Sequence, residues 1–296
     1  DGEEDPDVLP QLESVYSDGW TICWYLCGSN LETFYGCASS DLAEAMAVSL
    51  PANVRLVIQT GGSYEWHNEM VSAGVIQRYL LDSNGLTLLE EQPDADIISI
   101  SQLDGGHTEF CRCRDCLKIV REDKCYMGPM LRFINRIADE VAKEYPDVKI
   151  HTLAYLDSQQ TPKVTVPRDN VIVQVCTINC CFNHPIQTDD YEDNATLMRD
   201  LENWCKVCDN VWVWDYTTSF KFYLMPFPNL NVLRDNMRYF ADNHVKGLFE
   251  EGNYNSVNGE FGELRAYLLA RLAQNPYMTD EEYEEQKSKV LSYDFM

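Results

Sequence analysis

The sequence predicts an α/β protein in which a partial or open TIM-barrel-like (β/α) repeat follows a small βαβ-plus-hairpin lobe. From residue 94 onward, five short apolar runs alternate with amphipathic segments, a pattern typical of parallel strands joined by helices. Before residue 94, a strand, a helix and a strand are followed by two strands around a tight-turn signal. The pattern changes at Gln92-Pro93-Asp94, which we take as the domain boundary.

The N-terminal lobe is predicted from four apolar runs and one helix. The first run, Trp20 to Cys27 (WTICWYLC), is continuously apolar, as in strands buried on both faces. Residues 39–50 start with a Ser/Asp capping signal and carry apolar residues at helical spacing. Asn84-Gly85 predicts a hairpin turn, because this pair adopts positive φ readily. The strands are expected at 20–27, 54–59, 75–81 and 86–90.

The C-terminal part alternates strands and helices with a regular spacing. Its strands are expected at 97–101, 149–155, 171–176, 211–216 and 247–251. Its helices are expected at 128–144, 194–207, 231–243 and 259–273, with a charged helix near the C-terminus. A closed barrel needs eight strands, so five strands predict an open barrel or one whose edge the N-terminal lobe covers.

Composition indicates a globular protein and excludes several partners. Hydrophobic residues make up 45% of the chain, enough for a packed core and too many for a disordered protein. The 48 Asp and Glu against 23 Lys and Arg give a net charge of -25, which repels phosphate backbones, so we expect no nucleic-acid partner. No window approaches the roughly 20 apolar residues that span a bilayer, so we expect no membrane span.

Residues 1–19 form an acidic leader that lacks the basic-then-apolar order of a signal peptide. Leaders of this kind are common in mature exported bacterial proteins from which a signal has been removed. We therefore expect a secreted or cell-envelope protein.

Twelve cysteines fall into clusters, one of which lies in the loop after the strand at 97–101. This cluster is Cys111-x-Cys113-x-x-Cys116, with Cys125 nearby. Four thiolates at this spacing could hold a tetrahedral zinc ion. Two disulfides, one disulfide with free thiols, or unpaired thiols fit the pattern as well. In each case the cluster would brace a loop at the mouth of the sheet.

Carboxylates stand at the ends of the predicted strands. In parallel α/β folds the functional groups collect there, because the following loops converge on one mouth. The predicted catalytic residues are Asp104, Asp215, Glu250 and Glu251. Burial beside an apolar strand raises a carboxyl pKa towards the range of a general acid, and two such groups can cleave a glycosidic bond. This chemistry needs no metal and no cofactor. A surface or helix-capping role is the alternative for each acid.

Aromatic and polar side chains near these acids predict a sugar site. The C–H faces of sugar rings stack on aromatic side chains, and amide and imidazole groups can bind hydroxyls. The predicted substrate-binding residues are Tyr155, His184, Trp214, Tyr216, Asn253 and Tyr254. The partner class is therefore carbohydrate.

From about Pro93 to Phe295 the chain resembles a bacterial family known as domain of unknown function 4838. The resemblance rests on PDADIISISQLDGG, CRCRDC, GPMLRFINRIADEVAKEYPDVKIHTLAY, PRDNVIVQVC, VWVWDYTT, PFPNLNVL and KGLFEEGNYNS. It implies an exported protein of polysaccharide-degrading bacteria, built like the later part of a glycosidase barrel related to α-glucuronidases. The family supplies no catalytic residues, so the acids named above rest on their positions alone.

From about Trp20 to Pro93 the chain resembles the start of clostripain-family cysteine peptidases. The resemblance rests on WTICWYLCGSNLE, DLAEAM and NVRLVIQTGGSYEWHNEMVSAGVIQRYLLDSNGLTLLEEQP. The family's catalytic His and Cys come later, in motifs that this sequence lacks, so the resemblance implies the first βαβ unit and hairpin without the dyad. It stands where the other family carries its earlier barrel strands.

These observations predict a glycoside-hydrolase-like protein that acts on or binds polysaccharide, through paired carboxylates where it is active. The alternatives are a non-catalytic carbohydrate-binding or cell-surface module and, less favoured, a cysteine peptidase.

Overall fold

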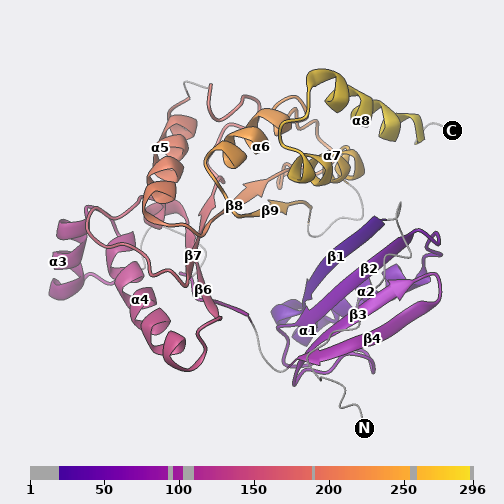
Figure 1. The fold of residues 1–296 in the computed structure, drawn as a ribbon, viewed down its shortest axis with the longest axis horizontal. Coiled ribbons are helices and arrows are strands. Elements are labelled where there is room, and N and C mark those ends of the chain that lie inside the picture. Colours follow the sequence, from indigo (N-terminus) through magenta and orange to yellow (C-terminus); the bar gives the residue numbers. More distant parts are fainter. Residues whose placement is uncertain (1–19, 93–95, 103–109, 189–190, 254–258, 294–296) are drawn as a thin grey trace, which may run out of the picture. The chain divides into compact units, whose positions relative to one another are not determined.

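The computed structural model describes residues 20–92, 96–102, 110–188, 191–253 and 259–293. It divides the chain into two compact units, Asp1–Ala95 and Asp96–Met296. Both units are shown in Figure 1. We call them the N-terminal unit and the C-terminal unit and describe each by itself.

The N-terminal unit is a four-stranded sheet with two short helices. Strand β1 (Trp20–Cys27) pairs in parallel with β2 (Val54–Gly61), and β2, β3 (Ile76–Asp82) and β4 (Gly85–Gln92) pair antiparallel in that order. The predicted βαβ unit and hairpin are therefore both present. A compact apolar core joins the sheet to the helices, formed by Leu26, Ala38, Leu42, Ile58, Trp66, Val71, Tyr79 and Leu81.

Two details of this unit differ from the prediction. β1 lies at the edge of the sheet, with Ile22 and Tyr25 exposed, so it is not buried on both faces. A helix α1 (Ser29–Tyr35) precedes α2 (Cys37–Ala47), and Gly36, at a φ of 66°, ends the first and starts the second. This left-handed residue lets two helices follow each other directly, a junction that apolar periodicity does not reveal.

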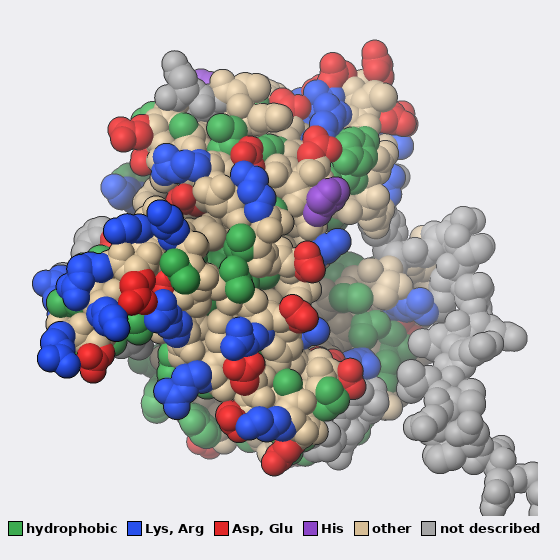
Figure 2. All heavy atoms as spheres, turned by 60° about the vertical axis from the view of Figure 1, so that its left-hand side comes forward, with side chains coloured by type: hydrophobic (Ala, Val, Ile, Leu, Met, Phe, Trp, Pro, Cys, Tyr) green, Lys and Arg blue, Asp and Glu red, His purple; other side chains and the backbone are tan. Residues whose placement is uncertain are grey.

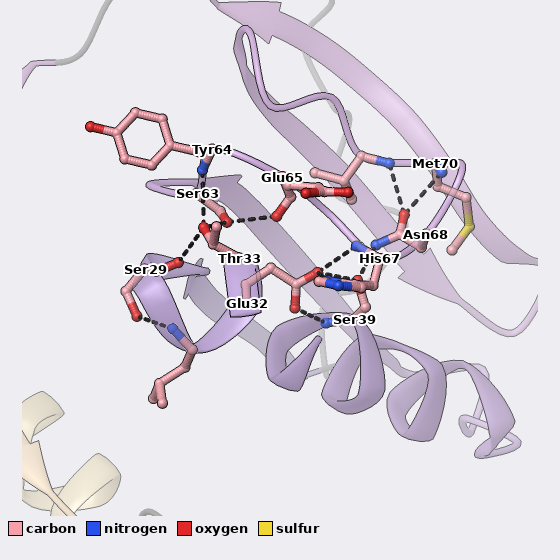
Figure 3. A network of polar contacts seen from close by, with 12 residues as sticks. Ser29, Glu32, Thr33, Ser39, Ser63, Tyr64, Glu65, His67, Asn68 and Met70 are labelled. Carbon is pink, nitrogen blue, oxygen red and sulfur yellow. Dashed lines mark hydrogen bonds and ion pairs between the residues drawn. The ribbon is translucent and has the colours of Figure 1, made fainter. Parts of the chain in front are cut away.

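A buried carboxylate ties the helices of this unit to the loop after β2. Glu32 has no exposed surface, and its oxygens accept hydrogen bonds from Ser39 N (2.8 Å), Ser39 Oγ (2.5 Å) and His67 N (2.7 Å). Asn68 donates in turn to Ser39 Oγ over 2.7 Å. Figure 3 shows these side chains converging between the helices and the loop. Although burial opposes ionisation, the hydrogen bonds prevail and lower the pKa of Glu32.

The C-terminal unit is a curled parallel half-barrel of five strands. The strands lie in chain order: β5 (Ile97–Ser99), β6 (Lys149–Ala154), β7 (Val171–Cys176), β8 (Val211–Tyr216) and β9 (Gly247–Glu251). All four pairings are parallel, as the alternation of strands and helices predicted. Five strands among the residues that the structure describes do not close a TIM barrel.

Helices connect and cover these strands. The helices of this unit are α3 (Arg114–Asp123), α4 (Met127–Glu144), α5 (Glu192–Val207), α6 (Leu233–Asp242), α7 (Gly262–Gln274) and α8 (Asp280–Tyr293). In Figure 1, α4 to α7 lie along one side of the curved sheet. The short helix α3 was not predicted, because six of its ten residues are charged and we assigned the segment to the loop that carries the cysteine cluster.

Alternate residues of each strand face the helices and form the main core. On β7 and β8, Val173, Val175 and Val213 have no exposed surface and pack with Leu131 and Trp204 of the helices. Along each strand, residues that face the helices alternate with residues that point to the opposite face of the sheet, as the pleat requires. No helix in the described ranges is long and apolar enough to cross a membrane.

The face away from the helices carries large polar and aromatic side chains. His151 lies on β6 with its Nε2 2.8 Å from Gln174 Oε1 on β7, and its ring centroid lies 6.1 Å from that of Trp212 on β8. Gly247 of β9 gives this indole its space, since a Cβ atom there would lie 2.5 Å from the Trp212 ring.

Candidate functional site

A pocket of about 410 Å³ lies at the carboxyl ends of the strands of the half-barrel. Leu153 and Cys176 contribute to it from β6 and β7, and Trp214 and Glu251 from β8 and β9. Tyr216 ends β8, and the other lining residues lie within four residues after a strand, because the loops at this edge converge as they do in closed barrels. The location agrees with the rule used to select the acids in the sequence.

Aromatic rings form one wall of the pocket. Trp214 and Tyr216 lie two residues apart on β8 and therefore on one face, with ring centroids 6.5 Å apart and planes 29° apart. Phe220, in the following loop, packs edge-on against Tyr216 at 5.9 Å. Phe249 on β9, the register partner of Trp214, packs against its indole with a centroid distance of 4.4 Å. Tyr155, after β6, also lines the pocket.

A carboxylate is fixed against this wall. Glu251 Oε2 accepts a hydrogen bond of 2.7 Å from the indole Nε1 of Trp214. The backbone oxygen of Glu251 accepts two more bonds, from Thr217 N (3.0 Å) and Thr217 Oγ1 (2.9 Å), which tie the end of β9 to the end of β8. Burial and the nearby charge of Glu251 raise the pKa of Cys176 to about 12, so this thiol stays protonated and is a poor nucleophile.

One residue that lines the pocket, Gln102, has a buried acceptor with no donor among the described residues. Gln102 lies after β5, and its Nε2 donates to Tyr155 O (3.1 Å) and Ser158 Oγ (2.9 Å). These bonds fix the orientation of the amide. Its Oε1 is buried and accepts no hydrogen bond within the part of the chain that the structure describes. A buried acceptor of this kind is satisfied when a ligand hydroxyl or a water donates to it.

Asp215 and Glu250 lie on the opposite face of the sheet from this pocket. They are paired neighbours on β8 and β9, one register position before Tyr216 and Glu251, so the pleat turns them away from the aromatic wall. Asp215 is 5% exposed and accepts a hydrogen bond of 2.5 Å from Thr177 Oγ1. Neither residue lines the pocket. We predicted from the sequence that Asp215 and Glu251 lie in one pocket. In the structure their side chains point to opposite faces of the sheet, and only Glu251 lines the pocket.

The two buried acids affect each other's ionisation. Burial raises the pKa of Asp215, and the hydrogen bond from Thr177 only partly opposes this effect. Burial, together with the neighbouring Asp215, raises the pKa of Glu250 well above its usual range. Both carboxyl oxygens of Glu250 are buried and make no hydrogen bond among the described residues. Burial and the neighbouring acid therefore favour the protonated form of Glu250.

The other predicted substrate-binding residues divide into three groups. Tyr155, Trp214 and Tyr216 line the pocket. His184 lies in the loop after β7, where its Nδ1 is 3.3 Å from Cys181 Sγ, and it does not line the pocket. Asn253 lies beside Gly259, two residues beyond Glu251, and is also absent from the lining. The predictions for Asp104 and Tyr254 fall outside the described residues.

Sequence patterns missed several lining residues. These are Gln102, Leu153, Cys176, Ile178 and Phe220. Each lies on a predicted strand or within a few residues of its end, so the strand-end rule would have included them if it had been applied to every residue type and not to acids and large aromatics alone. The side of the sheet that Asp215 faces could also have been predicted, because it shares the parity of Val211 and Val213.

Comparison with known proteins identifies a family for most of the chain. The model of the family described as Domain of unknown function (DUF4838) matches residues 81–289, more than two thirds of the chain. The match begins in β3 and so includes the last hairpin strand of the N-terminal unit. No curated protein matches the chain. The chain therefore belongs to the DUF4838 family.

Proposed function

We propose that the chain binds carbohydrate in the pocket at the carboxyl edge of the half-barrel, with a sugar ring stacked on Trp214 or Tyr216 and hydroxyls bound by Glu251 and Gln102. The single observation that carries this proposal is the fixed pair of an aromatic face and a carboxylate, Trp214 and Glu251, in one pocket. A sugar offers both an apolar C–H face and donor hydroxyls, so it matches both groups at once.

The size and the polar groups of the pocket support this ligand class. Its volume of about 410 Å³ lies in the range of small-molecule sites, about 300–1,000 Å³. The unsatisfied Gln102 Oε1 accepts one hydrogen bond, which a sugar hydroxyl supplies. The net charge of -25 disfavours phosphorylated ligands and does not affect a neutral sugar. Export of the protein, which the family resemblance implies, would give the site access to polymeric carbohydrate.

Binding is better supported than hydrolysis by this geometry. Paired-carboxylate hydrolysis needs two acids on either side of one glycosidic bond. Glu251 is the one carboxylate of the described lining residues, and Asp215 and Glu250 lie across the sheet. Hydrolysis is the second candidate because Asp104 follows the lining residue Gln102 by two positions in the sequence. The resemblance of residues 20–93 to clostripain-family peptidases adds no activity, because the catalytic motifs do not occur in the sequence.

A binding screen tests the proposal. The chain is titrated with oligosaccharides of several neutral and uronic-acid polymers, and binding is measured by calorimetry for the wild type, Trp214→Ala and Glu251→Gln. We expect one oligosaccharide class to bind and each substitution to weaken it by about tenfold or more, since each removes a contact worth about 1.4 kcal/mol or more. Trp212→Phe, two residues earlier on the same strand and outside the pocket, should bind as the wild type does. Unchanged affinity in Trp214→Ala and Glu251→Gln would refute this site.

A second measurement separates hydrolysis from binding. Release of reducing ends and of aryl leaving groups is measured for the wild type, Glu251→Gln, Asp104→Asn and Asp215→Asn. Hydrolysis through this pocket predicts loss of activity in Glu251→Gln and Asp104→Asn, with a smaller change in Asp215→Asn. Binding without turnover in the wild type identifies a non-catalytic module.

A further inference from the structure

Three cysteines outside the pocket lie close together at the start of α3. The Sγ atoms of Cys111, Cys113 and Cys116 all lie within 4.8 Å of one another. In a tetrahedral zinc site with Zn–S bonds near 2.3 Å, neighbouring sulfurs are about 3.8 Å apart. The three thiols therefore need only small side-chain rotations to contact one ion. We propose that they form a binding site for a thiophilic metal ion, with Zn²⁺ as the common biological occupant.

The backbone at the start of α3 positions Cys113 and Cys116. Cys113 is the N-cap of α3 in an extended conformation, with a φ of -63° and a ψ of 162°, and Cys116 lies in the first turn of the helix. The N–H of Cys116 donates to Cys113 Sγ over 3.5 Å, and the N–H of Leu117 donates to Cys113 O over 3.0 Å. Backbone N–H groups directed at a ligand sulfur are the kind of outer contact that stabilises a metal-bound thiolate.

The surrounding charge suits a thiolate cluster. Three thiolates and one Zn²⁺ carry a net charge of -1, and Arg112 and Arg114 flank Cys113 in the sequence. The left-hand side of Figure 1, which carries α3, α4 and α5, faces the viewer in Figure 2 and bears many Lys and Arg side chains despite the acidic composition of the chain. Positive charge nearby would offset the net negative charge of the metal-bound cluster.

Cys125, the fourth cysteine of the sequence cluster, does not lie with the other three. Cys125 is 6% exposed and packs in the main apolar core with Met127 and Leu131, so it is not one of the group near α3. Within the described ranges the site therefore has three protein ligands. The alternative of four thiolates at one ion, which the sequence left open, does not fit this placement of Cys125.

Disulfide pairing explains the cluster less well. Three thiols cannot all pair with one another, so one would stay reduced beside a disulfide. All twelve cysteines lie in the described part of the chain, and none of them forms a disulfide there. A metal ion uses all three thiols at once and accounts for the C-x-C-x-x-C spacing as well as the short Sγ separations. The proposal does not depend on the sugar pocket.

Metal titration of the full-length chain tests the proposal. The protein is reduced, freed of reductant under anaerobic conditions and titrated with Co²⁺, which gives thiolate-to-metal charge-transfer absorption, and then with Zn²⁺, which displaces it. We expect one equivalent of Co²⁺ to bind and one equivalent of Zn²⁺ to remove the signal. Alkylation followed by mass spectrometry should show that Zn²⁺ protects Cys111, Cys113 and Cys116 specifically.

Matched variants make the test decisive. Cys113→Ser should weaken metal binding by more than about 100-fold, the upper range for loss of an outer-shell partner alone. Cys37→Ser, which removes an exposed cysteine of the N-terminal unit, should bind as the wild type does. Circular dichroism of both variants verifies that they are folded. Absence of the charge-transfer band, its persistence in folded Cys113→Ser, or a disulfide between two of the three cysteines that survives reduction would each overturn the proposal.

Discussion

The indole N–H of Trp214 donates a 2.7 Å hydrogen bond to the carboxylate of Glu251 on the neighbouring strand. This contact fixes the one described carboxylate of the pocket against its aromatic wall, and the backbone bonds from Thr217 hold the ends of both strands together. The next residue back on β9, Glu250, lies on the other face of the sheet beside Asp215. Two adjacent glutamates therefore have different environments and different predicted roles.

Substitution of Trp214 by Phe should weaken sugar binding while keeping an aromatic face. The change removes the donor that orients Glu251, a charge-assisted hydrogen bond worth about 1.5–3 kcal/mol. We expect affinity to fall by about tenfold or more. Calorimetric titration of this variant beside Trp212→Phe measures the effect, and equal affinities for the two variants would show that the Trp214–Glu251 bond plays no part in binding.

Gln102 should contribute through its unsatisfied oxygen. Gln102→Met removes both Oε1 and the donor to Tyr155 O and Ser158 Oγ, so it should weaken sugar binding and also lower thermal stability. Ser158→Ala is the matched control, because it loses the contact with Gln102 Nε2 but keeps Oε1. We expect Ser158→Ala to lower the melting temperature with a much smaller loss of affinity. A similar loss of affinity in both variants would assign the effect to loop stability alone.

Glu250 should make stability depend on pH. Its pKa is raised in the folded state, so as the pH rises this carboxyl group ionises first in the unfolded chain. The free energy of unfolding therefore falls as the pH rises from the unfolded pKa through the folded pKa. Glu250→Gln removes this effect. We expect a higher melting temperature than the wild type at pH 8 and little difference at pH 4. Glu263→Gln, an exposed position on α7, should follow the wild type at both pH values. A variant less stable than the wild type at pH 8 would mean that Glu250 is charged and paired.

Glu32 should have the opposite effect on the N-terminal unit. Its folded pKa is lowered, so its contribution to stability is present above the unfolded pKa and is lost as the pH falls through the folded pKa. Glu32→Gln places an amide donor among the N–H and O–H donors of Ser39 and His67, which Figure 3 shows. The substitution should lower the free energy of unfolding by about 1–3 kcal/mol at pH 7. Denaturant unfolding at pH 7 and pH 3 measures this, with exposed Glu44→Gln as the control. Equal losses at both pH values would exclude a role for the charge.

The strands and most helices of the C-terminal unit could be predicted from the sequence because apolar periodicity reports burial directly. β7, β8 and β9 have the predicted bounds, and the parallel pairing follows from the helices between them. Helix α3 was missed because its charged segment was assigned to a loop, and the Gly36 junction was missed because a single left-handed residue leaves no apolar pattern. The edge position of β1 was missed because an apolar run does not tell which strands become its neighbours.

The candidate site was predicted in location and only partly in residues. Parallel strands bring their carboxyl ends to one edge, so Trp214, Tyr216, Tyr155 and Glu251 were found from their positions alone. Asp215 was assigned to the same pocket because it ends an apolar strand, but strand parity, not proximity to the end, decides which face a side chain reaches. The orientation of Gln102 depends on hydrogen bonds to residues more than 50 positions away, which no local pattern encodes.

The decisive measurement for sugar binding in this pocket is a crystal structure of the chain soaked with the oligosaccharide that binds best. We expect a sugar ring parallel to the face of Trp214 or Tyr216, with one hydroxyl on Glu251 and another on Gln102 Oε1. A sugar bound elsewhere on the chain, with this pocket occupied by water alone, would contradict it.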